Sequence, residues 1–298
     1  MTTISLDHLT LLELTPPELV AVAGGAGFAH VGLRLNPAAA PGERQHPMLG
    51  DSPMRRETLA RMRETGVAVF DFGVFRLKRG VDVRSFDPVL ETAAVLGASY
   101  AVVNGDEPDA QALADLLGQL CELGGGYGIR MNLEPTPWTG VPTIAAALRV
   151  IDLCGHRDAR LMIDTIHADR SNATFADLAA VPRSLIEYVQ VCDAAGPRPT
   201  DFGTMIHQAR NERAFPGEGN LDLAGMLCAL PSGIPLSLEA PVGSLAGRLR
   251  PVERAKRGLQ ATAALVAAVA RRRESAEALR TNMRSRIAST SAGNGTSR

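Results

Sequence analysis

The sequence predicts a closed barrel of eight parallel strands, each followed by a helix, on three observations. First, short β-like runs alternate with longer helical patterns eight times along 298 residues, a length that suits one α/β barrel. Second, hydrophobic residues make up 45% of the chain and aromatics only 4%, which suits aliphatic helices packed on a parallel sheet. Third, the first strand lacks the glycine-rich phosphate turn of a doubly wound sheet, the competing fold.

The strands are predicted from short apolar runs bounded by turn residues. They cover residues 3–8, 27–35, 67–72, 100–104, 129–134, 160–164, 185–191 and 234–239. The helices are predicted from apolar periodicity and from end signals, such as Pro16 and Pro17 in a first turn. They cover residues 15–25, 55–64, 88–96, 109–123, 143–153, 175–179, 221–230 and 251–271.

The remaining segments set the predicted domain organisation. Residues 36–53 form a loop too long to be a simple connection, and residues 194–220 form a polar segment. One barrel domain is expected over residues 1–273. The Ser-, Thr-, Asn- and Gly-rich tail over residues 274–298 is expected to be disordered at its end.

Composition excludes several function classes. A net charge of −1 and a pI near 6.6 give no attraction toward nucleic acid or an anionic membrane. We find no signal peptide and no apolar run of membrane-spanning length. The four cysteines are widely spaced, which favours buried thiols in a reducing compartment, so a cytoplasmic protein is expected. A homo-oligomer is left open.

Four polar residues stand at the ends of the last four predicted strands: Glu134, Asp164, Gln190 and Glu239. In a barrel the carboxyl ends of neighbouring strands meet at one face, so these side chains can converge. Their oxygen-only donor set predicts one divalent metal ion, Mn²⁺ first and Mg²⁺ or Co²⁺ as alternatives. The plainer alternative is that they are helix caps or salt-bridge partners.

Further polar residues are expected to bind a substrate at the same face. His167 follows Asp164 by three residues and could hold a substrate oxygen or add a nitrogen ligand. Trp138 could stack on a sugar-like ring. The other candidates are His8, Arg34, Asn104 and Arg213.

The chain resembles the xylose-isomerase-like sugar phosphate isomerase/epimerase superfamily, whose fold is a TIM barrel. The resemblance covers residues 3–270 and rests on Asn132-Leu-Glu-Pro, Met162-Ile-Asp-Thr-Ile-His, Val189-Gln-Val-Cys-Asp and Ser237-Leu-Glu. It implies that Glu134, Asp164, Gln190 and Glu239 hold one divalent metal, and that Glu134 and Glu239 move the substrate proton. Gln190 departs from the histidine more usual at its position.

The resemblance implies a small polyhydroxy ketone as the substrate and leaves three functions open. The leading one is a metal-dependent isomerase or epimerase of a hydroxy-ketone sugar or cyclitol, working through an enediolate. The second is a dehydratase of the dehydroshikimate or inosose type, which shares the proton abstraction. The third is a non-catalytic barrel with a decayed metal site. The superfamily's endonuclease branch is disfavoured, because this chain lacks its extra histidines and a basic DNA-binding face.

Overall fold

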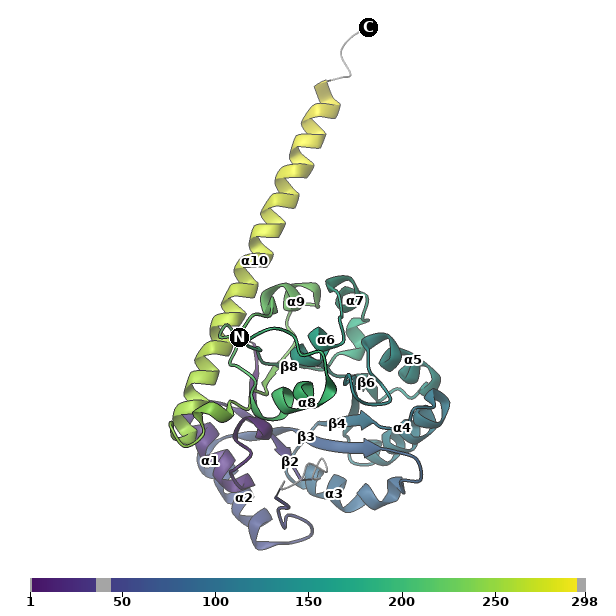
Figure 1. Ribbon diagram of the computed structural model, residues 1–298, viewed down its shortest axis with the longest axis vertical. Helices are drawn as coiled ribbons and strands as arrows, with labels where there is room; N and C mark the ends of the chain where they lie inside the picture. The colour runs from purple at the N-terminus through teal and green to yellow at the C-terminus, as the bar shows by residue number, and fades with distance from the viewer. Residues whose placement is uncertain (1, 36–43, 294–298) are drawn as a thin grey trace.

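The computed structural model describes residues 2–35 and 44–293 and contains one parallel sheet that closes into a barrel (Figure 1). Neighbours in the sheet follow the order β6-β5-β4-β3-β2-β1-β9-β8-β7, and every pairing is parallel. The strands are β1 (Ile4–Asp7), β2 (His30–Arg34), β3 (Ala68–Leu77), β4 (Tyr100–Gly105), β5 (Arg130–Glu134), β6 (Ala159–Leu161), β7 (Ile163–Asp164), β8 (Val189–Val191) and β9 (Leu236–Leu238).

The predicted fold class is confirmed, with one difference in the strand count. The sixth predicted strand is divided at Met162 into β6, which pairs with β5, and β7, which pairs with β8. These two short segments together take the place of one strand, and the chain through Met162 joins the two ends of the sheet. The break places Asp164 at the start of the next helix, where its side chain accepts a hydrogen bond from the Ile166 amide.

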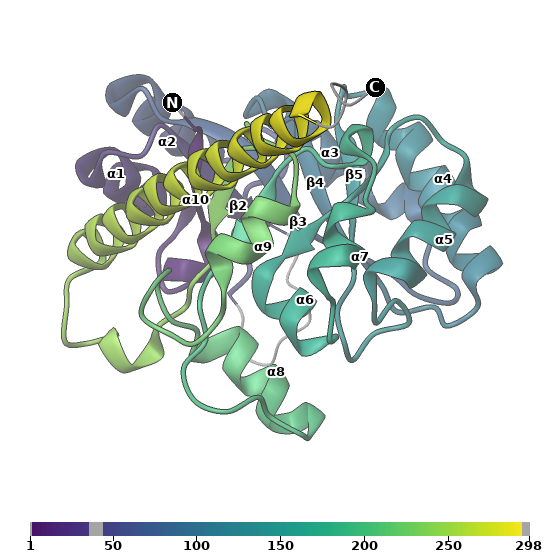
Figure 2. The ribbon, with the colours of Figure 1, turned by 90° about the horizontal axis from the view of Figure 1, so that it is seen from above.

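Helices surround the strands on the outside (Figures 1 and 2). They are α1 (Pro16–Ala26), α2 (Pro53–Thr65), α3 (Asp87–Val95), α4 (Ala110–Gly125), α5 (Ile144–Cys154), α6 (Thr165–Arg170), α7 (Phe175–Ala179), α8 (Phe202–Asn211), α9 (Leu223–Ala229) and α10 (Pro251–Gly293). Short 3₁₀ turns follow β1 at η1 (His8–Leu11), precede α3 at η2 (Val83–Phe86), and occur at η3 (Arg183–Leu185) and η4 (Gly243–Leu245).

Two segments differ from the sequence-based expectation. The polar segment 194–220 contains α8, which is capped by Asp201 and lies over the mouth of the barrel. The last helix continues beyond residue 273 to Gly293 and projects away from the barrel, whereas its first part packs against α1 and α9 (Figure 1). Residues 36–43 and 294–298, parts of the predicted loop and tail, lie outside the described residues.

The interior of the barrel is closed at the amino-terminal side by aromatic rings. Phe70, Tyr100 and Tyr188 have ring centroids 5.0–5.5 Å apart, and His30 meets Phe70 at 5.7 Å. Above them Val74, Val102 and Met162 are buried. This packing leaves the carboxyl ends of the strands as the place for a pocket.

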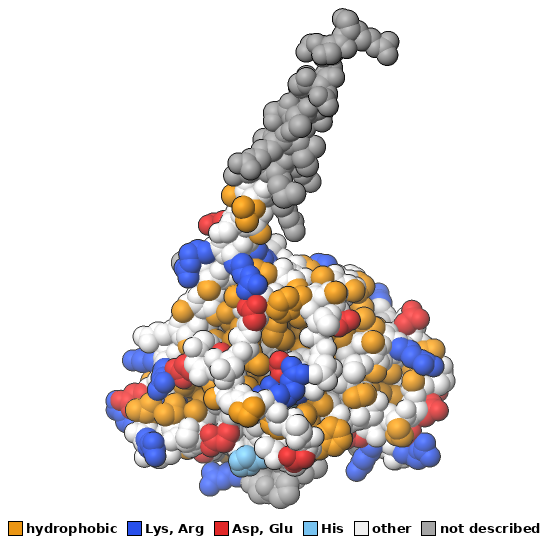
Figure 3. Space-filling model, turned by 45° about the horizontal axis from the view of Figure 1, so that its top comes forward, with side chains coloured by type: hydrophobic (Ala, Val, Ile, Leu, Met, Phe, Trp, Pro, Cys, Tyr) orange, Lys and Arg blue, Asp and Glu red, His pale blue; other side chains and the backbone are white. Residues whose placement is uncertain are grey.

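The outer surface is mixed in charge. Acidic and basic side chains are interspersed over the face shown in Figure 3. No helix in the described part of the chain is long and apolar enough to cross a membrane.

Candidate active site

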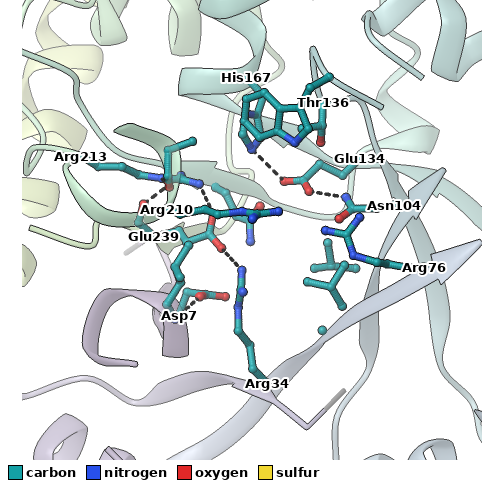
Figure 4. A pocket seen from close by; sticks show the side chains of 17 residues that line it. Asp7, Arg34, Arg76, Asn104, Glu134, Thr136, His167, Arg210, Arg213 and Glu239 are labelled. Carbon is teal, nitrogen blue, oxygen red and sulfur yellow. Dashed lines mark hydrogen bonds and ion pairs between the residues drawn. The ribbon is translucent and has the colours of Figure 1, made fainter. Parts of the chain in front are cut away.

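A pocket opens at the carboxyl ends of the strands, where the sequence predicts the site (Figure 4). It holds about 580 Å³ of space between its atoms, part of it open to solvent, which is enough for a small-molecule ligand. Its polar and charged lining residues are Asp7, Arg34, Arg76, Asn104, Glu134, Thr136, Trp138, His167, Gln190, Arg210, Arg213 and Glu239.

Glu134 ends β5 and lies on one wall of this pocket. Asn104, from the end of β4, donates its Nδ2 to Glu134 Oε2 at 2.7 Å. The register of the two strands sets this contact, because Asn104 is paired with Glu134 across the sheet. Burial raises the pKa of Glu134 to about 8, and the charges of Glu239 and Asp164 add to that shift.

Arg213 lies between two predicted metal ligands. Its Nη1 is 2.7 Å from Asp164 Oδ2, and its Nη2 is 2.9 Å from Glu239 Oε2. The guanidinium also donates to the carbonyl oxygens of Ala209 and Glu239. All three charged side chains are buried, so the arginine neutralises carboxylates that would otherwise repel one another.

Glu239 follows β9 and is held on both oxygens. Oε1 accepts from Arg34 Nη2 at 3.2 Å, opposite the contact of Oε2 with Arg213. Burial raises the pKa of Glu239, whereas the charge of Arg213 lowers it. Figure 4 shows Glu239 across the pocket from Glu134.

His167 on α6 completes a compact group of donors. Its Nε2 is 3.7 Å from Asp164 Oδ2 and 3.9 Å from Glu134 Oε1. Donor atoms of Glu134, Asp164 and His167 lie within 4.8 Å of one another, a spacing that could hold a metal ion. Burial lowers the pKa of His167 well below its ordinary range, so the ring is neutral and able to bind a cation.

Gln190 provides the test of whether a cation suits this site. Gln190 lines the pocket, and its side-chain oxygen is buried without a hydrogen-bond partner. A buried amide oxygen without a partner is costly unless something binds it, and a hard cation is one such partner. The carboxylates of Glu134 and Asp164 and the nitrogen of His167, whose spacing could hold a metal ion, are the kinds of donor that suit a divalent ion, and an amide oxygen is of the same kind.

The structure places the other candidates differently. Arg34, Asn104, Trp138 and Arg213 line the pocket. Trp138 packs edge-on against His167, with ring centroids 5.2 Å apart. His8 does not line the pocket: its buried ring lies in η1, where Nε2 contacts the Leu14 carbonyl and Nδ1 accepts from the Arg34 amide.

Several lining residues were not among the principal candidates from sequence. Asp7 ends β1, is buried and lines the pocket. Asp71 in β3 is also buried but is not one of the lining residues. Asp7 carries the signal that marked the other ligands, a carboxylate after an apolar run at a strand end. Arg76, from β3, and Arg210, from α8, also line the pocket, and Arg76 pairs with Asp106 at 2.8 Å.

The sequence of this chain is similar to those of known proteins. A family model described as xylose isomerase-like TIM barrel matches residues 20–265. A curated 3-dehydroshikimate dehydratase of Pseudomonas putida strain KT2440 is 27% identical over 251 residues, covering 79% of this chain and 37% of that protein. The chain thus spans little more than a third of the length of that relative.

Solved structures share the fold. A fusion protein of a xylose isomerase-like TIM barrel with a 4-hydroxyphenylpyruvate dioxygenase superposes with a TM-score of 0.76 at 23% identity, over 93% of this chain and 44% of that one. The IolI protein with a bound zinc atom gives 0.72 at 18% identity, covering 89% of this chain and 98% of that one. An L-ribulose 3-epimerase superposes with a TM-score of 0.69 at 18% identity, over 94% of this chain and 98% of that one.

The family model spans most of the barrel, and the strand-end donors lie where its fold gathers catalytic side chains. The chain belongs to the xylose isomerase-like TIM barrel family.

Proposed function

We propose that this chain is a metal-dependent dehydratase acting on a β-hydroxy ketone that carries a carboxylate, of the 3-dehydroshikimate type. The observation that carries the proposal is the pairing of two kinds of group in one pocket. Carboxylate, amide and imidazole donors line it together with the basic side chains of Arg34, Arg76 and Arg210. Arginine suits a substrate carboxylate, which a neutral ketose does not have.

The dehydratase relative supports the choice of substrate class. 3-Dehydroshikimate combines a ketone, a neighbouring hydroxyl, a second hydroxyl one carbon further and a carboxylate. The first two groups suit the donor cluster, and the carboxylate suits the arginines. The size of the pocket agrees with one six-membered ring.

The metal would be held by the four strand-end residues Glu134, Asp164, Gln190 and Glu239. Of these, Glu134 and Asp164 stand with His167 in the group whose spacing could hold an ion. A divalent cation bound there would supply a Lewis acid that polarises the substrate carbonyl. Glu134 removes the proton from the carbon beside the carbonyl, and Asn104 fixes the orientation of the Glu134 carboxyl. Trp138 restricts one side of the pocket and orients His167.

Loss of the β-hydroxyl then completes the elimination and leaves a conjugated product. His167 is placed to hold a substrate oxygen, because its ring faces the pocket beside Glu134. The neutral state of the ring allows it to donate or accept a hydrogen bond without adding charge.

An isomerase or epimerase remains the second candidate, on one specific observation. Glu134 and Glu239 approach the pocket from opposite sides, an arrangement that permits proton removal on one face and return on the other (Figure 4). The two functions share the first proton transfer and differ in whether a hydroxyl is lost.

The deciding experiment supplies 3-dehydroshikimate and, separately, a ketose to enzyme loaded with Mn²⁺, Mg²⁺ or Co²⁺. A dehydratase gives a conjugated product that absorbs in the ultraviolet, whereas an epimerase gives a stereoisomer without new absorbance. Glu134→Gln should abolish both turnover and exchange of the substrate α-proton with solvent deuterium. Glu122→Gln is the matched control, because Glu122 is 85% exposed on α4. Full dehydration by Glu134→Gln would remove Glu134 from its proposed role.

A further inference from the structure

In the proposed dehydration the departing hydroxyl group must receive a proton, and none of the residues described above has that role. Three carboxyl groups line the pocket: Asp7, Glu134 and Glu239. Glu134 is occupied as the base. Glu239 accepts from two arginines, one on each oxygen, which stabilises its charged form and makes it a poor donor. Asp7 is the carboxyl that remains.

A second buried carboxyl group, Asp71, lies two strands away from Asp7, on the other side of Gly32. Across the sheet Asp7 is paired with Gly32, and Gly32 is paired with Asp71. A Cβ on Gly32 would lie 2.1 Å from Asp71 Oδ1 and 3.2 Å from Asp7 Oδ2. Glycine at this position therefore leaves the space in which the two carboxyl groups face each other.

Among the described residues, no arginine, lysine or histidine forms an ion pair with Asp7 or Asp71. Asp7 Oδ1 accepts from the Leu9 amide at 2.7 Å, and Asp71 Oδ2 is buried without a hydrogen-bond partner. One oxygen of each carboxyl group lies within 3.2 Å of the point where a Cβ of Gly32 would be, so two charged carboxylates would repel each other strongly in this dry interior, which favours a proton on the pair.

The surrounding charges act on Asp7 in both directions. Glu239 favours its protonated form, whereas Arg34 and Arg213 favour its charged form. Tyr188 lies beside Asp71. Burial raises the pKa of Asp7 to about 7, and burial followed by the charge of Asp7 raises that of Asp71 well above its ordinary range.

The barrel interior below the pair offers a route for the proton to be replaced. Ser5 on β1 and Ser237 on β9 face each other across the sheet, and both hydroxyl oxygens are buried without a protein partner. Such hydroxyls are the groups that ordered water molecules satisfy in protein interiors.

We infer that Asp7 and Asp71 share one proton inside the barrel, and that Asp7 donates this proton to the hydroxyl group that leaves the substrate. Asp7 is then a catalytic residue, and Asp71 is a positioning residue that keeps the proton on the pair. The inference about donation rests on the proposed dehydratase function. Figure 4 shows Asp7 beneath Glu239 and beside Arg34.

The step balances as follows. The carbon–hydrogen bond beside the carbonyl breaks, and Glu134 takes the proton. The carbon–oxygen bond at the β-carbon breaks with its electron pair, and the leaving oxygen takes the Asp7 proton, so that one water molecule is released. Glu134 returns its proton to solvent, and the pair of Asp7 and Asp71 takes one up.

Infrared spectroscopy tests the shared proton without any substrate. The difference spectrum of wild type minus Asp71→Asn, at pH 6 in the metal-loaded protein, should contain the carbonyl stretch of a protonated carboxyl group. The same band should appear for wild type minus Asp7→Asn, because either substitution removes or shifts the stretch of the carboxyl group that carries the shared proton. The control Asp115→Asn, on the exposed side of α4, should give no such band. Difference spectra without the band for both variants would overturn the sharing.

Kinetics test the donation. Asp7→Asn should lower the rate of dehydration about 10²–10⁴-fold, the usual contribution of a general acid, while exchange of the α-proton with deuterium stays at the wild-type rate. An analogue with fluoride in place of the leaving hydroxyl should restore turnover, because fluoride leaves without a proton. Asp71→Asn should move the alkaline limb of the kcat profile to lower pH, since loss of the neighbouring charge lowers the pKa of Asp7.

The outcomes separate the two claims. If wild-type enzyme fails to dehydrate 3-dehydroshikimate, the proposed function falls, and the infrared arm still decides whether the pair holds a proton. If wild type is active and Asp7→Asn dehydrates equally fast, Asp7 is not the donor. Loss of both dehydration and deuterium exchange in a folded Asp7→Asn protein would also overturn the assignment, because it would indicate a role in the first step.

Discussion

Replacing Arg213 with methionine should destabilise the metal-free protein by about 3–5 kcal/mol at pH 7, the range for breaking a buried ion pair. The substitution removes the guanidinium that lies 2.7 Å from Asp164 and 2.9 Å from Glu239. Methionine retains the length of the side chain and its contacts with apolar neighbours. The two carboxylates then remain in the interior without their cation.

The magnitude can be worked from the carboxyl groups themselves. The variant can relieve the repulsion by protonating Glu239, whose ordinary pKa is 4.5. Protonating such a group at pH 7 costs about 3.4 kcal/mol, and at pH 5 only about 0.7 kcal/mol. A carboxyl whose folded pKa is raised contributes stability below its unfolded pKa and loses it as the pH rises. The deficit should therefore be small near pH 5 and large at pH 7.

Urea unfolding of metal-free protein at pH 5 and pH 7 measures this directly. The matched control is Arg198→Met, which removes an exposed ion pair with Asp169 at 2.8 Å and should cost at most about 1 kcal/mol at either pH. Added Mn²⁺ should stabilise Arg213→Met more than wild type, because the cation takes over the charge of the arginine. A deficit below about 1 kcal/mol at pH 7, or one that does not change with pH, would refute this account of Arg213.

Three further predictions concern the same face of the barrel. Gln190→His should bind Mn²⁺ or Co²⁺ at least as tightly as wild type in calorimetric titration, because imidazole is a better ligand than an amide, and Gln190→Leu should bind more weakly. Loss of binding in a folded Gln190→His protein would show that residue 190 does not contact the ion. Gly32→Ala should lower the melting temperature by several degrees, because the new Cβ would lie 2.1 Å from Asp71 Oδ1. The control Gly25→Ala should not, because the nearest atom to its new Cβ is 3.6 Å away. Equal melting temperatures for the two variants would contradict the close approach at Gly32. Burial lowers the pKa of His8 to about 4, so His8 costs the folded protein stability as the pH falls from about 6.5 to 4. His8→Gln should therefore gain stability relative to wild type over that range in pH-dependent unfolding; a difference between the two proteins that does not change with pH would mean that His8 does not titrate in this way.

The sequence by itself determined the architecture and the strand-end chemistry. Eight alternations of apolar runs and amphipathic patterns predicted the barrel, because hydrophobic periodicity reflects which face of each element is buried. Polar residues at strand ends predicted that Glu134, Gln190 and Glu239 would meet in one pocket, and the structure brings them to that pocket. This inference needs only the rule that parallel strands share a carboxyl-terminal face.

The tertiary structure decided the electrostatics. The sequence placed Arg213 as a substrate ligand, and only the fold shows it bound between Asp164 and Glu239, since α8 must form and cross the barrel mouth to bring it there. The proximity of Asp7 and Asp71 could not be predicted either. The two residues are far apart in the chain, and the strand register on both sides of Gly32 brings them near each other. Local patterns report the burial of one segment, whereas charge neutralisation inside a barrel depends on distances between segments that only packing fixes.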